Sequence, residues 1–283
     1  MELGWGILAL GVLFGEAMAQ WQPSLAEYHA DRTCQSSTTL RLYRSDPLAF
    51  YRNYLGESRP DDQTAFAMGR AFHAALEGTY FDDFVVEPKF DMRTTAGKDG
   101  AKAFAESNFG KTPVSQAVHD FVVAGLKAVS EHQEAWKLIN MPGQNELSTK
   151  WQDKSGLALK VRFDRLLDDG TILEYKTSEA SGAAALSQFS KHAKFFGYDL
   201  QAAMYSRGRD MLGMKGGHIF IVVTKTAVPQ VMVLRSSASF LSRGRLALDD
   251  ATRRLAQAIA REELDPGKHN WVQPHFKEIQ ELL

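Results

Sequence analysis

The sequence has few of the features that mark a specialised class of protein. It has 283 residues and one cysteine, Cys34, which excludes an internal disulfide, a cysteine-rich zinc site and a four-cysteine iron–sulfur cluster. No charge sign dominates, because 33 Lys and Arg oppose 34 Asp and Glu. A polyanion could therefore bind only to a local basic patch. Hydrophobic residues (44%) and charged residues (24%) exclude collagen, coiled coil and wholesale disorder.

The sequence also has no long hydrophobic run. Its uncharged N-terminal stretch, Leu3 to Gly15, is 13 residues long, whereas a membrane span needs roughly 20. The stretch could be the core of a secretory signal over residues 1–19, with Ala17-Met18-Ala19 as the cleavage site. A signal requires positive charge before its core, and this segment has Glu2 instead. We therefore expect residues 1–27 to lie outside the core and the protein to be cytoplasmic, without a membrane partner.

The pattern of apolar and turn residues predicts a single α/β or α+β domain over residues 28–283. Helices are expected as two short segments within 36–55, broken at Asp46-Pro47, and at 64–78, 113–138, 192–209 and 238–262. Strands are expected at 145–152, 157–167, 171–177, 217–225 and 230–236. Residues 91–112 read as a loop with at most a helical turn at 101–107.

One predicted hairpin has a charged pattern that depends on its register. Asp168-Asp169-Gly170 suits a three-residue loop with glycine in the left-handed conformation, which pairs Leu167 with Thr171. Asp164 then faces Glu174, and Arg162 faces Lys176, on one face of the sheet. A two-residue loop would shift the register by one residue and point the two carboxylates to opposite faces.

Two opposed carboxylates repel each other unless a cation lies between them. Mg²⁺ binds through one or two carboxylates together with water and phosphate oxygens, and it acidifies a bound water. Lys176 beside Asp164 and Glu174 could orient that water or stabilise charge on a phosphate. The alternative is a solvated face in which these charges pair diagonally for under about 1 kcal/mol each.

Three motifs in the sequence resemble those of the PD-(D/E)XK nucleases. The first is Asp164 followed by Glu174-x-Lys176 on the next strand. Gly69-x-x-x-His73 resembles a motif upstream of the core, and Gln201-x-x-x-Tyr205 resembles a helix motif after it. The set is similar to the RecE, RecB and AddB nuclease domains and, more loosely, to lambda exonuclease. Residues 36–54 and the tail from Trp271 resemble the RecE-like exonuclease domain of phages and prophages.

The resemblance implies a restriction-endonuclease-like core, in which a central mixed sheet of about five strands is flanked by helices. It implies that Asp164, Glu174 and the Tyr175 carbonyl ligate Mg²⁺ or Mn²⁺, with His73 as a further ligand or phosphate contact. Lys176 would be the catalytic lysine, and Gln201 and Tyr205 would orient the site or hold DNA. Without the resemblance, His73 and Tyr205 read as core residues. Glu146 is an acidic neighbour that reads equally as a salt-bridge partner.

The resemblance further implies a metal-dependent exonuclease that digests duplex DNA ends in the 5′-to-3′ direction. Such enzymes support phage-type recombination with a single-strand annealing protein and form ring-like homo-oligomers. Arg41, Arg44, Lys191 and Lys194 are candidate phosphate contacts. The cysteines of an AddB-type cluster are absent, so no iron–sulfur cofactor is expected. The alternative function is a catalytically inactive nuclease-like module that only binds DNA.

Overall fold

The computed structural model describes residues 21–54 and 63–261. Its helices are α2 (Leu25–Ala30), α3 (Ser37–Ser45), α4 (Pro47–Tyr54), α5 (Gln63–Glu77), α6 (Tyr80–Asp83), α7 (Thr95–Ser107), α8 (Gln116–Glu131), α9 (Gln133–Ile139), α10 (Ala185–Phe195), α11 (Tyr198–Met211) and α12 (Ala238–Ala260). Its strands are β1 (Phe84–Val86), β2 (Thr112–Val114), β3 (Gly143–Asn145), β4 (Ser148–Gln152), β5 (Ala158–Arg162), β6 (Arg165–Leu167), β7 (Ile172–Ser178), β8 (His218–Thr224) and β9 (Val231–Arg235).

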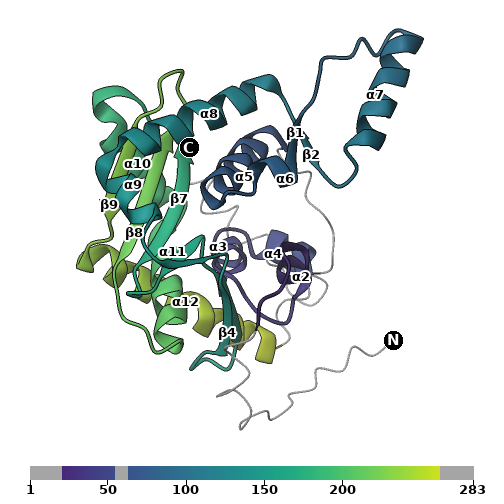
Figure 1. The fold of residues 1–283 in the computed structure, drawn as a ribbon. Coiled ribbons are helices and arrows are strands. Elements are labelled where there is room, and N and C mark those ends of the chain that lie inside the picture. The colour runs from purple at the N-terminus through teal and green to yellow at the C-terminus, as the bar shows by residue number, and fades with distance from the viewer. Residues whose placement is uncertain (1–20, 55–62, 262–283) are drawn as a thin grey trace, which may run out of the picture.

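A five-stranded mixed sheet forms the centre of the molecule, in the order β3-β6-β7-β8-β9 (Figure 1). Strands β7 and β8 are parallel, and the other neighbouring pairs are antiparallel. Parallel neighbours need a crossover connection, which α10 and α11 supply between β7 and β8. The predicted fold class, an α/β protein with a mixed sheet of about five strands, is confirmed.

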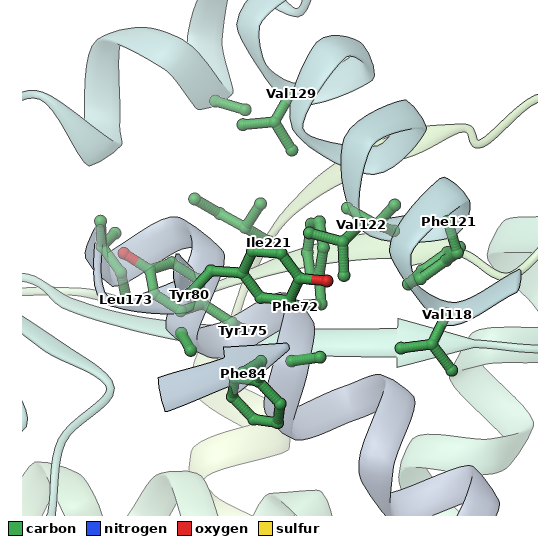
Figure 2. Close-up of a cluster of buried hydrophobic side chains, with 14 of the residues drawn as sticks. Phe72, Tyr80, Phe84, Val118, Phe121, Val122, Val129, Leu173, Tyr175 and Ile221 are labelled. Carbon is green, nitrogen blue, oxygen red and sulfur yellow. The ribbon is translucent and has the colours of Figure 1, made fainter. Parts of the chain in front are cut away.

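Helices cover both faces of this sheet because its strands bury apolar side chains on both faces. On one face, α5 and α8 enclose a cluster in which Phe72 and Val122 meet Tyr175 and Ile221 (Figure 2). On the other face, α11 and α12 pack Leu200 and Leu248 against the sheet and the β4–β5 hairpin. Successive residues of the central strand β7 therefore face opposite layers: one residue faces α5 and α8, and the next faces α11 and α12.

The hairpin before β7 differs from the prediction. The two strands predicted at 145–152 and 157–167 are each broken, giving β3 with β6 in the central sheet and β4 with β5 in a separate two-stranded sheet. Both ladders keep one register, so the breaks at Glu146-Leu147 and Phe163-Asp164 lie opposite each other. Glu146 has a φ of 57°, a left-handed conformation that turns the chain there. The predicted pairing of Arg162 with Lys176 is wrong, because Arg162 lies in β5, in the separate sheet, and the ladder with β7 reaches only to Arg165.

Three helix predictions also need correction. Pro113 lies in β2, and α8 begins after Ser115, whose side chain accepts a hydrogen bond from Val118 N. The helix predicted at 192–209 is two helices, which separate at Gly197 with a φ of 66°. The region predicted as a loop at 91–112 contains the 13-residue helix α7, which projects from the body with β1 and β2 at its base (Figure 1).

The structure describes only part of the segments at the two ends of the chain that the domain prediction concerns. The apolar stretch, the candidate signal at 1–19 and the tail from Trp271 lie outside the described residues. Within them, Pro23 accepts a hydrogen bond from Arg162 (2.8 Å), and the Lys150 amine lies 4.9 Å from the Trp21 ring centroid. No helix within 21–54 or 63–261 combines the length and the apolar character needed to cross a bilayer.

Candidate active site

Strand β7 positions the two charged side chains at the centre of the site. The turn before it matches the prediction: Leu167 N donates to Thr171 O (2.9 Å), and Gly170 has a φ of 79°. This register puts Asp164 level with Glu174, one residue beyond the last paired residue of β6. Because side chains alternate along a strand, Glu174 and Lys176 point to the same face of the sheet.

Glu174 is almost completely buried, and one of its oxygens is held by two donors. Lys176 Nζ donates to Oε1 at 2.5 Å, and Gln201 Nε2 donates to the same atom at 2.6 Å. Gln201 lies in the first turn of α11, which packs over this face of the sheet. Within the described residues, the buried Oε2 atom of Glu174 receives no hydrogen bond. The carboxylate therefore has one free oxygen inside the protein.

The carboxylate of Asp164 is fixed from the other side. Its Oδ2 accepts a hydrogen bond from the backbone N–H of Tyr175 at 2.7 Å, next to the point where the pairing of β6 with β7 stops. His73, on α5, places Nδ1 3.7 Å from the same oxygen. The structure thus brings together His73 from α5, Asp164 from the bend before β6, and Glu174 and Lys176 from β7.

Burial raises the pKa of both carboxylic acids, and repulsion adds to each shift, from Glu146 at Asp164 and from Asp164 at Glu174. Burial raises the pKa of Asp164 to about 6, although Lys176 and the Tyr175 N–H oppose the shift. Burial, and then the charge of Asp164, raise the pKa of Glu174 to about 7. Burial lowers the pKa of Lys176, but the charges of Glu174 and Asp164 outweigh it and leave that pKa above its ordinary value. Near neutral pH, the site holds an ammonium group between two acids that can still take up protons.

His73 has the opposite shift. Burial and the nearby charge of Lys176 lower the pKa of His73 to about 4, although Glu174 and a hydrogen bond with the Tyr175 backbone oppose the change. The imidazole is therefore neutral at pH 7, the protonation state in which histidine accepts a metal or a proton. Its ring also meets the Tyr175 ring edge to face, with 5.8 Å between centroids.

Two further acids, Glu146 and Glu77, lie near Asp164, and only Glu146 was considered in the sequence analysis. Glu146 accepts a hydrogen bond from Arg162 Nε, and its backbone N–H donates to Asp164 O at 3.2 Å. Glu77 was not predicted. It follows His73 by four residues on α5, and this i, i+4 spacing was the signal that could have identified it. Burial, and then the charge of Glu146, raise the pKa of Glu77 far above its ordinary value.

Two tyrosines of α11 have different surroundings. Tyr205 is buried, and its ring meets Phe163 edge to face, with 5.6 Å between centroids. Together with Asp164, Glu146 and Arg162 it lines a cavity of about 370 Å³ that extends to the start of α3. Tyr198 was not assigned a role from the sequence, yet its ring lies 5.1 Å from Lys176 Nζ.

The predicted DNA-contacting residues lie on two helices near this site. Arg41 Nη1 donates to the Phe196 carbonyl at 2.7 Å, which joins α3 to the turn between α10 and α11. Arg44, Lys191 and Lys194 are exposed. The structure therefore brings Arg41 close to the end of α10, where Lys194 lies, and the contact of these residues with DNA stays a prediction.

The oxygen atoms of the site are of the kind that binds a hard divalent cation, but they are not arranged around a common point where a cation could bind. Carboxylate and carbonyl oxygens are the ligands that Mg²⁺ prefers, and the free Oε2 of Glu174 is a buried oxygen that lacks a partner. Across the part of the chain that the structure describes, no three His, Cys, Asp or Glu side chains are arranged to hold a metal ion. Coordination of a cation by Asp164, Glu174, the Tyr175 carbonyl and His73 stays a prediction. In it, the cation would balance the negative charge of Glu174 that Lys176 balances in this structure.

Comparisons with known proteins agree with this geometry. A family model described as "PDDEXK-like domain of unknown function" matches residues 36–270, and the chain belongs to this family. The resemblance to the PD-(D/E)XK superfamily is thereby confirmed. A crystal structure from Eubacterium rectale, named "Putative exonuclease", has a similar fold with a TM-score of 0.62. It is 14% identical in sequence, and the match covers 86% of this chain and 88% of that one. No curated protein matches the sequence.

Proposed function

We propose that the protein is a metal-dependent deoxyribonuclease that hydrolyses phosphodiester bonds from the ends of duplex DNA. The observation that carries the proposal is the arrangement around Glu174. This buried carboxylate is held by Lys176 and Gln201, keeps one free oxygen and lies level with Asp164. The family match and the name of the similar structure, an exonuclease, support the same activity.

Each residue of this set has a chemical task in phosphodiester hydrolysis. Asp164 and Glu174 would hold Mg²⁺ or Mn²⁺, which supplies Lewis acidity toward a phosphate oxygen and lowers the pKa of a bound water. Lys176 would donate hydrogen bonds to the attacking water or to the phosphate, whose negative charge increases in the transition state. Gln201 would keep Glu174 in place, because its amide N–H bonds directly to the carboxylate. Neutral His73 beside Asp164 would add a ligand or a phosphate contact.

Digestion in the 5′-to-3′ direction, a role in phage-type recombination with an annealing protein, and assembly as a ring-like homo-oligomer are parts of the same proposal. They are supported by the resemblance to RecE-like domains. The alternative is an inactive module that binds DNA. The intact acid–lysine set favours an enzyme, because a binding module gains nothing from burying two acids whose pKa values burial raises.

The deciding experiment compares linear and circular duplex DNA of one sequence, end-labelled where linear, while Mg²⁺ or Mn²⁺ is titrated. We expect the linear DNA to lose mononucleotides from its ends and the circle to persist. Separate 5′ and 3′ labels give the direction of digestion. Intact linear DNA at every cation concentration from pH 6 to 9, together with DNA binding that is insensitive to EDTA, would establish the inactive module instead.

A further inference from the structure

A row of rings runs from the catalytic lysine candidate to the protein surface. Lys176 Nζ lies over Tyr198, the Phe196 ring stacks on Tyr198 with 6.0 Å between centroids and a 26° angle, and Phe195 meets Phe196 edge to face at 5.1 Å. His192 also meets Phe196 edge to face, at 6.2 Å. We call His192, Phe195, Phe196 and Tyr198 the aromatic strip. Its inner end touches the site, and each ring is in contact with the next.

The outer end of the aromatic strip is exposed yet fixed in place. Phe195 is 83% exposed and Phe196 is 50% exposed. The turn that carries them is held by the left-handed Gly197 and by the hydrogen bond from Arg41 to the Phe196 carbonyl. Adjacent exposed phenylalanines at a fixed position beside a site indicate a surface that another molecule covers.

The charges around the aromatic strip indicate what that molecule is. From Ala180 to Tyr198 the chain contains no Asp or Glu, whereas Lys191 and Lys194 are both exposed beside the rings. Cations interleaved with exposed aromatic rings are the composition of surfaces that bind single-stranded nucleic acid, where phosphates meet the cations and bases stack on the rings. The charge complementarity therefore favours a nucleic acid strand over an apolar protein surface.

We propose that the aromatic strip is a stacking platform for unpaired bases at the end of the DNA substrate. Bases stack on Phe195 and Phe196, phosphates contact Lys191 and Lys194, and the strand continues over Tyr198 toward Glu174 and Lys176. This inference rests on the proposed nuclease function and adds a substrate preference to it. An end whose last bases are unpaired enters the site more readily than a blunt end, because the platform binds only unstacked bases.

The test measures binding separately from cutting. The Lys176→Ala protein is mixed in Mg²⁺ with duplexes that are blunt or carry a short unpaired end containing 2-aminopurine, whose fluorescence is quenched by stacking. We expect quenching and tighter binding with the unpaired end. Adding Phe195→Ala should remove the quenching and weaken binding to the unpaired end by about tenfold, with a much smaller effect on the blunt duplex. Phe195→Trp should preserve both signals.

Phe109→Ala is the matched control, because Phe109 is an exposed phenylalanine (93%) after helix α7. It should leave quenching and binding unchanged. If the Phe195→Ala protein binds the unpaired end as tightly as its parent while wild-type protein still cuts DNA, the stacking platform alone is wrong. If no variant binds or cuts DNA, the nuclease proposal fails with it. A change of oligomeric state on Phe195→Ala, seen by analytical ultracentrifugation, would make the strip an interface between copies and overturn the proposal.

Discussion

Glu146 lies directly opposite Asp164, at the position where the β3–β6 pair of the central sheet gives way to the separate β4–β5 pair. The Glu146 backbone N–H donates to the Asp164 carbonyl at 3.2 Å, and its φ of 57° makes it the only non-glycine residue with a positive φ in the described part of the chain. Asp164 lies in this bend, just before β6 begins at Arg165, and its carboxylate accepts a hydrogen bond from the Tyr175 N–H. Backbone strain at Glu146 thus accompanies the placement of the Asp164 carboxylate, a candidate metal ligand.

The strain at residue 146 can be measured with two substitutions. Glu146→Gly and Glu146→Ala both remove the carboxylate and its pairing with Arg162. They differ in the cost of the left-handed backbone, which favours glycine, and in the greater freedom of glycine in the unfolded chain, which offsets part of that gain. Since a Cβ atom costs roughly 1–2 kcal/mol in this conformation, we expect the glycine variant to have the higher free energy of unfolding by about 1 kcal/mol. Urea unfolding measures both values. A glycine variant that is less stable than the alanine variant would mean that residue 146 is not left-handed in solution.

Removing the amine of Lys176 should abolish hydrolysis without unfolding the protein. We expect Lys176→Ala to lower kcat by about 10²-fold or more, because a donor positioned at developing charge contributes an effect of that size. The measurement is the single-turnover rate on end-labelled linear DNA, with circular dichroism to verify folding. Lys127→Ala is the matched control, since Lys127 is an exposed lysine that pairs with Glu131 on α8. The activity of this variant should equal that of the wild type. Full activity of Lys176→Ala would exclude the assigned role.

Much of the fold followed from the sequence because periodicity records which face of an element is buried. The strands β7 and β8 and the helices α5 and α12 lie where the apolar pattern predicted them. The bend in the hairpin was missed because no glycine or proline marks Asp164; the signal that was overlooked is the alternation itself, which runs from Leu157 to Phe163 and breaks at Arg165. Helix α7 was missed because none of its residues is buried, so an apolar stripe was lacking.

The site itself was only partly visible in the sequence. The register of Asp164 with Glu174 could be derived, since Gly170 fixes the loop length. The contact of Gln201 with Glu174 came from the resemblance alone, because it joins residues 27 positions apart that no local pattern relates. Glu77 and Tyr198 were missed, since each becomes part of the site only through the packing of its helix.

The raised pKa of Glu174 predicts a pH-dependent loss of stability in the absence of metal. In the unfolded chain Glu174 ionises near 4.5, and in the folded protein near 7. The stability that this group contributes is therefore fully present below pH 4.5 and is lost as the pH rises through about 7. Glu174→Gln has no ionisable group at this position. The quantity to compare is the free energy of unfolding of the variant minus that of the wild type, both in EDTA. This difference should be larger at pH 8 than at pH 4.5 by on the order of 1–3 kcal/mol.

Buried histidines such as His73 and His218, whose pKa values are lowered by burial, change stability in the opposite direction over the same range. They are present in both proteins, so the difference between wild type and Glu174→Gln is the quantity to measure. Chemical unfolding at half-unit pH intervals provides it. A difference that is independent of pH would show that Glu174 is ionised at its ordinary pKa, and hence that the carboxylate is well solvated.

Divalent cations should stabilise the protein, and more strongly at high pH. A cation that binds Asp164 and Glu174 competes with their protons, whose pKa values of about 6 and 7 lie within the accessible range. We expect the rise in Tm on replacing EDTA with Mn²⁺ to be several degrees at pH 8 and close to zero at pH 5.5. Asp164→Asn should remove the rise at both pH values, whereas Asp169→Asn, in the exposed turn before β7, should retain it. A Tm that responds equally to Mn²⁺ at pH 5.5 and 8, or in Asp164→Asn, would place the cation elsewhere on the protein.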